Sequence, residues 1–185
     1  MSMIENKGES VLIKGSKFMY VWMFLATVGF LLACIFLIIH GLKFNSKYSF
    51  LYLGGGIVLT PFYLYLTIWS LPGLMPGKVL FRIFPGEKGT VNAKKDMVSI
   101  SNIRSINLVR NPLNLINDIV IDTFNDKKIK IKTYNLLGDL DYEMIVDQYI
   151  YPYMTENAKK VWDRKVDLER LRKVARYERK EPKIE

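Results

Sequence analysis

Two long apolar runs constrain this chain more than any other feature of its sequence. Residues 18–42 and 48–71 contain no Asp, Glu, Lys or Arg, and their one histidine is His40. A helix needs roughly 20 apolar residues to cross a hydrocarbon core of about 30 Å, and both runs are longer than that. A core helix of a soluble protein would carry a polar face. The sequence therefore predicts a two-helix transmembrane hairpin over 18–71.

The basic residues around this hairpin predict its orientation. Basic side chains close to a span favour the cytoplasmic side of a membrane. They are more numerous before the first run and after the second than in the connection between them, so we expect both termini to be cytoplasmic. The residues concerned are Lys7, Lys14 and Lys17 before the hairpin, Lys43 and Lys47 within it, and Lys78, Arg82, Lys88, Lys94 and Lys95 after it.

Two kinds of processing would change the interpretation of the first run. A secretory signal peptide has a shorter apolar region, of about 7 to 15 residues. Residues 31–34, Leu-Leu-Ala-Cys, resemble a lipobox, in which the cysteine is lipidated and becomes the new N-terminus. Residues 35–42 stay apolar, however, whereas a lipoprotein continues into a polar tether. We expect an uncleaved helix in which Cys34, the only cysteine, is a small packing residue.

Small residues predict where the two helices touch each other. Gly29 and Ala33 form a small-xxx-small pair in the first run, and residues 54–56, Gly-Gly-Gly, with Thr60 give the second a smooth surface. A neighbouring backbone can approach closely at such positions. We expect helix packing, and no transport pathway, from these glycines.

The chain after the hairpin divides into two parts. Residues 78–154 contain short runs rich in Val, Ile, Phe and Thr between turn residues, which is typical of an antiparallel meander. An apolar stripe from Tyr142 to Ile150, with Asp141 as N-cap, predicts a helix that covers the open face of the sheet. Residues 155–185 predict a charged C-terminal helix beginning at Thr155. The expected fold class is a membrane α-helical hairpin plus an α+β soluble domain.

The stretch 118–135, DIVIDTFNDKKIKIKTYN, predicts a β-hairpin with one wet face. Matching isoleucine to isoleucine places Ile121 opposite Ile131, with a three-residue loop at 125–127. On the other face Asp122 then lies opposite Lys130, a favourable cross-strand pair. We therefore interpret the acidic and basic residues here as a solvated sheet face and exclude a catalytic cluster.

The leader, 1–17, permits two interpretations. Residues 9–14, Glu-Ser-Val-Leu-Ile-Lys, alternate weakly and are bounded by glycines, which favours a single strand. A lone strand is unstable in water, so it would have to pair with the sheet built after Val79. The alternative is a disordered basic leader that only sets the orientation of the hairpin.

Enzyme chemistry has little support in this sequence. His40 and Cys34 both lie in apolar runs, so a histidine triad or a Cys/His zinc site is excluded from the soluble part. The sequence has no phosphate-binding glycine motif. We expect no enzyme activity, no cofactor and no metal. The acidic residues Asp139, Asp141, Glu143 and Asp147 are better explained by the start of a helix than by a cation site.

Several segments carry a resemblance to a known family. They are ESVLIKGSKF (9–18), GKVLFRIFPGEKGTV (77–91), VSISNIRSINLV (98–109) and NLLGDLDYEMIVDQYI (135–150). With them the chain resembles the bacterial PH-like membrane proteins, and more narrowly the small uncharacterised two-pass membrane proteins of Bacillus-type bacteria. The resemblance implies a location in the bacterial cell membrane. It also implies a PH-like sheet or partial barrel over 78–154, closed by a C-terminal helix, and it transfers no functional residue.

We expect a non-enzymatic, membrane-anchored scaffold or binding module that acts on a protein partner at the cytoplasmic face. The alternative is a PH-like module that senses anionic lipid, since the soluble part is basic. Nucleic acid is not an expected partner, because basic and acidic residues are mixed. The candidate lipid or partner contacts all lie in the C-terminal segment: Lys159, Lys160, Arg164, Arg172, Lys173 and Arg176.

Overall fold

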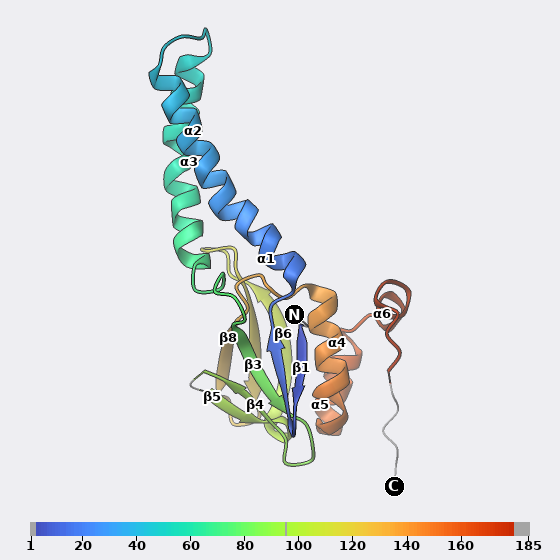
Figure 1. The fold of residues 1–185 in the computed structure, drawn as a ribbon. Helices are drawn as coiled ribbons and strands as arrows, with labels where there is room; N and C mark the ends of the chain where they lie inside the picture. Colours follow the sequence, from blue (N-terminus) through green and yellow to red (C-terminus); the bar gives the residue numbers. More distant parts are fainter. Residues whose placement is uncertain (1–2, 95, 180–185) are drawn as a thin grey trace.

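The computed structural model describes residues 3–94 and 96–179. It consists of an apolar helical hairpin that stands on an α+β domain (Figure 1). The first helical segment runs over Lys17–Leu42 as α1 (Lys17–Phe24), a π-helical turn (Leu25–Gly29) and α2 (Phe30–Leu42). The second helix is α3 (Ser49–Ser70). Both predicted apolar helices are confirmed, with bounds within one residue of those expected from hydropathy.

The two apolar helices pack on each other and expose the rest of their surface. Their most apolar windows have mean hydropathies of 2.6 and 1.5, and 11% of each window is buried inside the protein. Each helix is long and apolar enough to cross a membrane. Large apolar side chains are exposed along both helices, which suggests association with a membrane.

Two glycines allow close approach of α2 and α3. A Cβ at Gly56 would lie 2.7 Å from Ile38 Cγ1, and one at Gly41 would lie 2.6 Å from the backbone nitrogen of Leu53. The predicted role of Gly29 is wrong, because it meets only Leu25 and Phe24 of its own helical segment. Open space surrounds the Cβ positions of residues 54 and 55, so only the last glycine of this triplet lies at the contact.

The α+β domain contains two antiparallel sheets. The first has five strands in the order β1 (Ile4–Lys7), β2 (Ser10–Lys14), β3 (Val79–Phe84), β4 (Thr90–Ala93) and β5 (Asp96–Ser99). The second has three, in the order β6 (Ile103–Arg110), β7 (Asn117–Thr123) and β8 (Lys128–Lys132). Among the described strands the two sheets do not join into a closed barrel.

The hydrophobic core lies between these sheets and the helices that flank them, chiefly α4 (Asp139–Tyr149). Ile13 and Ile83 from the first sheet share one cluster with Ile121 from the second and with Ile145 from α4, and all four are fully buried. A helix therefore covers an open side of the sheets, as the apolar stripe predicted. It begins after Gly138, however, so the assignment of Asp141 as N-cap was wrong.

The leader forms two strands. The predicted strand 9–14 is confirmed as β2, which pairs with β3 on one side and with β1 on the other. The alternative of a disordered leader is thereby ruled out for the residues described. β1 was not expected, because its sequence, Ile-Glu-Asn-Lys, has no apolar alternation. A tight turn at Gly8, with φ of 61°, connects the two strands.

The junction between hairpin and domain is short and closely packed. Only two residues, Gly15 and Ser16, separate β2 from α1. A Cβ at Gly15 would lie 2.7 Å from the Leu136 Cβ, and the Ser16 amide donates to the Leu136 carbonyl at 2.8 Å. The Tyr20 hydroxyl donates to the Met75 carbonyl at 3.1 Å. These contacts fix the direction in which the helices leave the domain.

The β7–β8 hairpin has its predicted faces but another register. Ile121 lies opposite Ile129, and Asp122 lies opposite Lys128, which is a shift of two residues. The Thr123 side chain accepts from the Lys127 amide at 3.1 Å and donates to its carbonyl at 2.9 Å, which closes a four-residue loop. Asp118 was expected on the solvated face, but it is buried and pairs with Lys130 at 2.9 Å.

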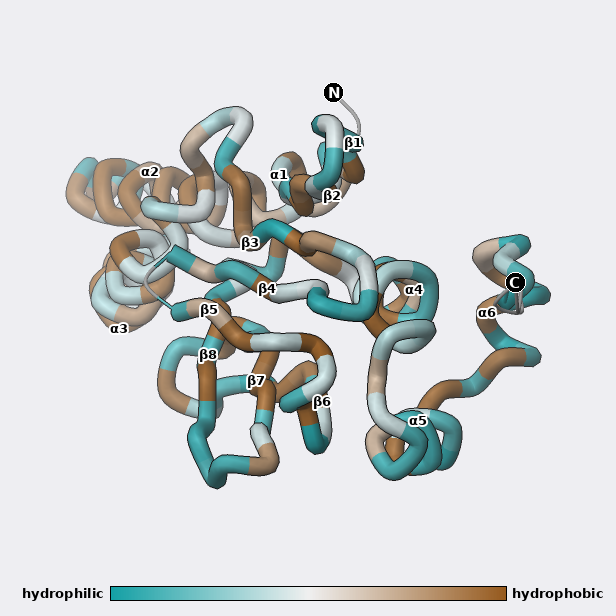
Figure 2. Tube along the Cα trace, turned by 90° about the horizontal axis from the view of Figure 1, so that it is seen from below, coloured by the Kyte–Doolittle hydropathy of each residue, from teal (hydrophilic) through white to brown (hydrophobic). Residues whose placement is uncertain are grey.

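The C-terminal segment contains two short helices in place of one long helix. They are α5 (Glu156–Asp163) and α6 (Leu168–Ala175). Thr155 caps α5 as predicted, because its side chain accepts from the Ala158 amide. The second helix has its own N-cap, Asp167, whose side chain accepts from the Arg170 amide at 2.9 Å. Figure 2 shows α5 and α6 on the side of the domain opposite α3; residues 180–185 of the predicted helix lie outside the described residues.

Candidate functional site

A cleft of about 450 Å³ lies between strand β6 and the helices α4 and α6. β6 is an edge strand, and within 3–94 and 96–179 it pairs only with β7. Its outer edge therefore forms one wall of the cleft. The lining residues come from β6, the start of β7, the first turns of α4, the end of α5, the segment between α5 and α6, and α6: Ile106, Asn107, Leu108, Arg110, Asn117, Asp139, Tyr142, Glu143, Trp162, Lys165, Val166 and Arg170.

Two polar atoms in this cleft have no partner in the described part of the chain. The Tyr142 side chain is 5% exposed, yet its hydroxyl makes no hydrogen bond. Oε2 of the neighbouring Glu143 is also buried and unpaired. Leaving such a group unpaired costs about 1 to 3 kcal/mol. The cleft thus holds an unused donor and an unused acceptor on consecutive residues of α4.

Burial also changes the ionisation of both side chains. Burial raises the pKa of the Tyr142 hydroxyl, and the Glu143 charge raises it further, so the phenol keeps its proton. Burial raises the pKa of the Glu143 carboxyl, although the nearby Arg170 guanidinium partly opposes this. Asp139 and Asp167 add to the upward shift of the Glu143 pKa. These perturbed groups at the wall of a cleft are typical of a binding site.

The rim of the cleft carries charges of both signs. Arg110, Lys165 and Arg170 face Asp139 and Glu143 around it. The Lys165 ammonium donates to Oδ1 of Asn107, which lies on β6 and links the segment after α5 to the sheet edge. A ligand with both donors and acceptors fits this rim better than a simple anion or cation does.

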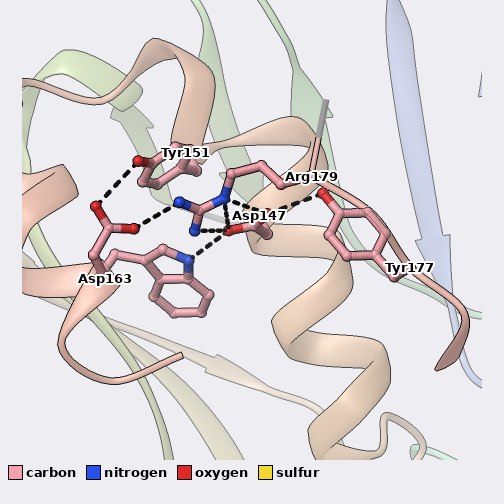
Figure 3. Close-up of polar contacts among 6 residues, drawn as sticks. Asp147, Tyr151, Asp163, Tyr177 and Arg179 are labelled. Carbon is pink, nitrogen blue, oxygen red and sulfur yellow. Dashed lines mark hydrogen bonds and ion pairs between the residues drawn. The ribbon is translucent and has the colours of Figure 1, made fainter. Parts of the chain in front are cut away.

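A second polar cluster, centred on Asp147, is fully paired. This buried carboxylate accepts from Trp162 Nε1 and the Tyr177 hydroxyl, each at 3.0 Å, and from Arg179 Nε (Figure 3). The Arg179 guanidinium also donates to Asp163 at 2.8 Å. The cluster ties α4 to α5 and to the chain after α6. Because its groups satisfy one another, we assign it a structural role.

Three of the six predicted C-terminal contacts have an ion-pair partner among residues 3–94 and 96–179, and three have none there. Lys159 pairs with Glu156 at 3.0 Å, Arg172 with Glu178 at 3.3 Å, and Lys173 with Glu169 at 3.4 Å. The remaining three side chains are exposed: Lys160, Arg164 and Arg176. All six lie on α5, α6 or their C-terminal ends, away from the hairpin (Figure 2). Their role as lipid or partner contacts stays a prediction.

Another basic site, which the sequence did not indicate, lies beside the end of α3. A pocket of about 290 Å³ is lined by four lysines from three segments: Lys78, Lys94, Lys130 and Lys132. Tyr134 and Asp96 complete its polar lining. The lysines were predicted only as orientation signals or as a solvated sheet face. Their gathering depends on the way β3, β8 and the β4–β5 turn meet.

These features define a class of protein: an α+β domain of two antiparallel sheets that carries an apolar helical hairpin between its second and third strands. The chain belongs to the DUF5381 family, a family of unknown function, whose model matches residues 9–172. This match extends from β2 to α6 and so includes the hairpin.

Two relatives are proteins of Bacillus subtilis (strain 168). The chain is 34% identical over 159 residues to the uncharacterized lipoprotein YfjD, covering 83% of this chain and 86% of that protein. It is 30% identical over 128 residues to the uncharacterized protein YfjE, covering 66% of this chain and 84% of that protein. These matches confirm the similarity to small uncharacterised Bacillus proteins. No solved structure matches the chain.

Proposed function

We propose that this chain is a non-enzymatic binding module, anchored in the bacterial cell membrane, that acts on a protein partner at the cytoplasmic face. In this proposal α2 and α3 form a two-pass anchor, and the two sheets closed by α4 serve as a PH-like scaffold. The pairing of β2 with β3 supports the anchor, because it requires the chain before and after the hairpin to lie on one side of the membrane.

The basic residues favour the cytoplasm as that side. The arrangement is testable with a reporter that is active only outside the cytoplasm. It should be silent after Glu185 and active when inserted between Phe44 and Tyr48. The reverse pattern would contradict the cytoplasmic placement.

Lipidation is the competing form of membrane attachment, because one relative carries the name lipoprotein. Cleavage before Cys34 would remove both leader strands, including the buried core residues Val11 and Ile13. The five-stranded sheet would lose two of its five strands. The structure therefore favours an uncleaved helix for this chain.

The observation that carries the binding proposal is the unpaired pair of polar atoms on α4, in the cleft beside the edge strand β6. A peptide backbone supplies an acceptor for the Tyr142 hydroxyl and a donor for Glu143 Oε2. An extended peptide can also pair through its main chain with a sheet edge, and the part of β6 that α5 does not cover lines the cleft. The mixed charges of the rim suit the polar groups of such a segment. The partner is therefore an extended segment of another protein.

A photo-crosslinking amino acid tests this proposal in intact cells. Placed at the exposed rim position Arg110 of the full chain, it should give a discrete protein adduct. Placed at Glu87, an exposed position in the turn before β4, it should not. Adding Tyr142→Phe and Glu143→Ala should reduce the Arg110 adduct severalfold. Equal adducts at both positions, or an Arg110 adduct insensitive to the double variant, would contradict the cleft as the binding site.

A further inference from the structure

The lysine pocket lies where the second apolar helix meets the domain. Its walls include Lys78, at the end of the short exit from α3, and Lys132, at the end of β8. The Lys132 ammonium lies 5.0 Å from the ring centroid of Trp69, in the last turn of α3. Figure 1 shows β8 and the start of β3 directly below the lower end of α3. If α3 crosses the membrane, this pocket lies at the level of the lipid headgroups.

The pocket carries an excess of positive charge. Lys130 is neutralised by the buried Asp118 at 2.9 Å. Asp96 lines the pocket but pairs with Lys127, which lies outside it, at 3.7 Å. Neither Lys94 nor Lys132 has a carboxylate partner among the described residues. Two ammonium groups are therefore available to an anion here.

The fourth lysine is held in place by neutral groups. The Lys78 ammonium donates to the Pro72 carbonyl and lies 4.1 Å from the ring centroid of Tyr134. Burial lowers the pKa of the Lys78 ammonium, and the charge of Lys94 lowers it further. A bound anion would relieve this repulsion between like charges.

From this juxtaposition we infer that the lysine pocket binds the phosphate of an anionic phospholipid in the cytoplasmic leaflet. Lys94 and Lys132 supply the charge, Lys78 and Tyr134 form the wall, and Trp69 lies against the lipid. Basic groups close to a bilayer attract anionic lipids, and aromatic rings prefer the interface. This site is separate from the β6 cleft, and it depends only on the anchor part of the proposed function.

Brominated lipids test the inference, since bromine quenches a nearby tryptophan. The full chain with Trp22→Phe is reconstituted in phosphatidylcholine vesicles that contain brominated phosphatidylglycerol or brominated phosphatidylcholine. Trp69 then reports lipid contact, while Trp162, buried in the domain, gives a constant background. From the quenching of Trp69 we expect phosphatidylglycerol to occupy the site in preference to phosphatidylcholine by more than about fivefold. This is the factor in binding that one basic group near an anionic surface contributes.

Substitutions of two pocket lysines test whether the lipid preference depends on their positive charge. Lys94→Gln with Lys132→Gln should reduce the preference to below about twofold, and the double arginine variant should retain it. The matched control, Lys159→Gln with Lys160→Gln on α5, should change nothing. For each variant, quenching by brominated phosphatidylglycerol is divided by quenching by brominated phosphatidylcholine. A changed contact between residue 132 and Trp69 affects both values and therefore leaves this ratio unchanged. No preference in the parent chain, or an unchanged preference in the double glutamine variant, would overturn the inference.

Glycerol phosphate in large excess distinguishes a lipid from a soluble ligand with the same phosphate group. A preference that survives this competitor supports the lipid headgroup. Loss of the preference would show a site for soluble phosphates and would contradict the membrane source. A failure of the anchor itself would appear separately, in the reporter experiment described above.

Discussion

Ile13 and Phe81 lie opposite each other in the β2–β3 pair, although the whole apolar hairpin separates them in the chain. Both side chains are buried in the same core. The hairpin is thus an insertion into the first sheet, since the sheet is complete only when β3, after the hairpin, pairs with β2, before it. The domain and the apolar helices form one structure with a fixed junction.

Because the hairpin is an insertion, we expect the first apolar helix to remain part of the chain. We expect the intact mass of protein extracted from membranes to correspond to an uncleaved and unlipidated first helix. Cys34→Ala should leave membrane retention unchanged, because Cys34 is a free, buried cysteine within α2 and in this account carries no lipid. A lipid-bearing chain that starts at residue 34, and disappears in Cys34→Ala, would contradict this expectation.

Helix packing in the hairpin depends on Gly56. Gly56→Val should destabilise the full chain in detergent by about 1 to 3 kcal/mol, because added carbons would clash with Ile38 and the Cys34 carbonyl. Gly55→Val is the matched control, because nothing lies within 4 Å of its Cβ position. Thermal melts of the two variants give the comparison. An equal loss for both would mean that backbone propensity, and not close approach, governs this site.

The Asp147 cluster fixes the C-terminal segment to α4. Arg179→Ala should destabilise the domain by about 3 kcal/mol, the low end for a buried pair, because the Arg179 side chain keeps 21% exposure. Arg172→Ala, which removes only an exposed pair with Glu178, should cost less than about 1 kcal/mol. Denaturant unfolding followed by Trp162 fluorescence measures both. Similar costs for the two arginines would show that the cluster contributes little.

Glu143 should make the folded protein less stable as pH rises. A carboxylate paired with a cation has the opposite effect. Its pKa is raised in the folded state, so the folded protein holds this proton more tightly than the unfolded chain does. The stabilising contribution is present below the ordinary value of 4.5 and is lost as pH rises through the folded value.

Glu143→Gln removes the ionisable group and tests this sign. The variant should be slightly more stable than the parent at neutral pH, by less than about 1 kcal/mol because solvent screens the partly exposed side chain. The two proteins should be equally stable at acid pH. Glu87→Gln, in an exposed turn, serves as control. A variant less stable than the parent at neutral pH would show that the Glu143 carboxylate has a stabilising partner.

The apolar helices could be predicted from sequence because length and composition alone determine them. The register of the β7–β8 pair could not be predicted in this way. Isoleucines at 119, 121, 129 and 131 allow two registers with identical faces, since a shift of two residues preserves alternation. The choice depends on the hydrogen bonds of Thr123 to Lys127 in the turn, which period-2 patterning does not contain.

The candidate sites were missed for a different reason. Tyr142 was counted as part of an apolar stripe, and only the packed structure shows that its hydroxyl has no partner. Lys78, Lys94 and Lys132 lie in three separate segments of the sequence, and they gather only where β3, β8 and the β4–β5 turn meet. The predicted basic residues of α5 and α6 are close in sequence, which made them visible without the fold.

Hydrogen exchange on the full chain in detergent tests whether the leader is part of the first sheet. β2 has a neighbour on both sides, so the amides of Val11, Leu12 and Ile13 point to either β1 or β3. We predict that these amides exchange as slowly as those of Phe81 and Ile83 in β3. Exchange as fast as in the exposed connection at 43–47 would contradict the assembly of the domain from both sides of the hairpin.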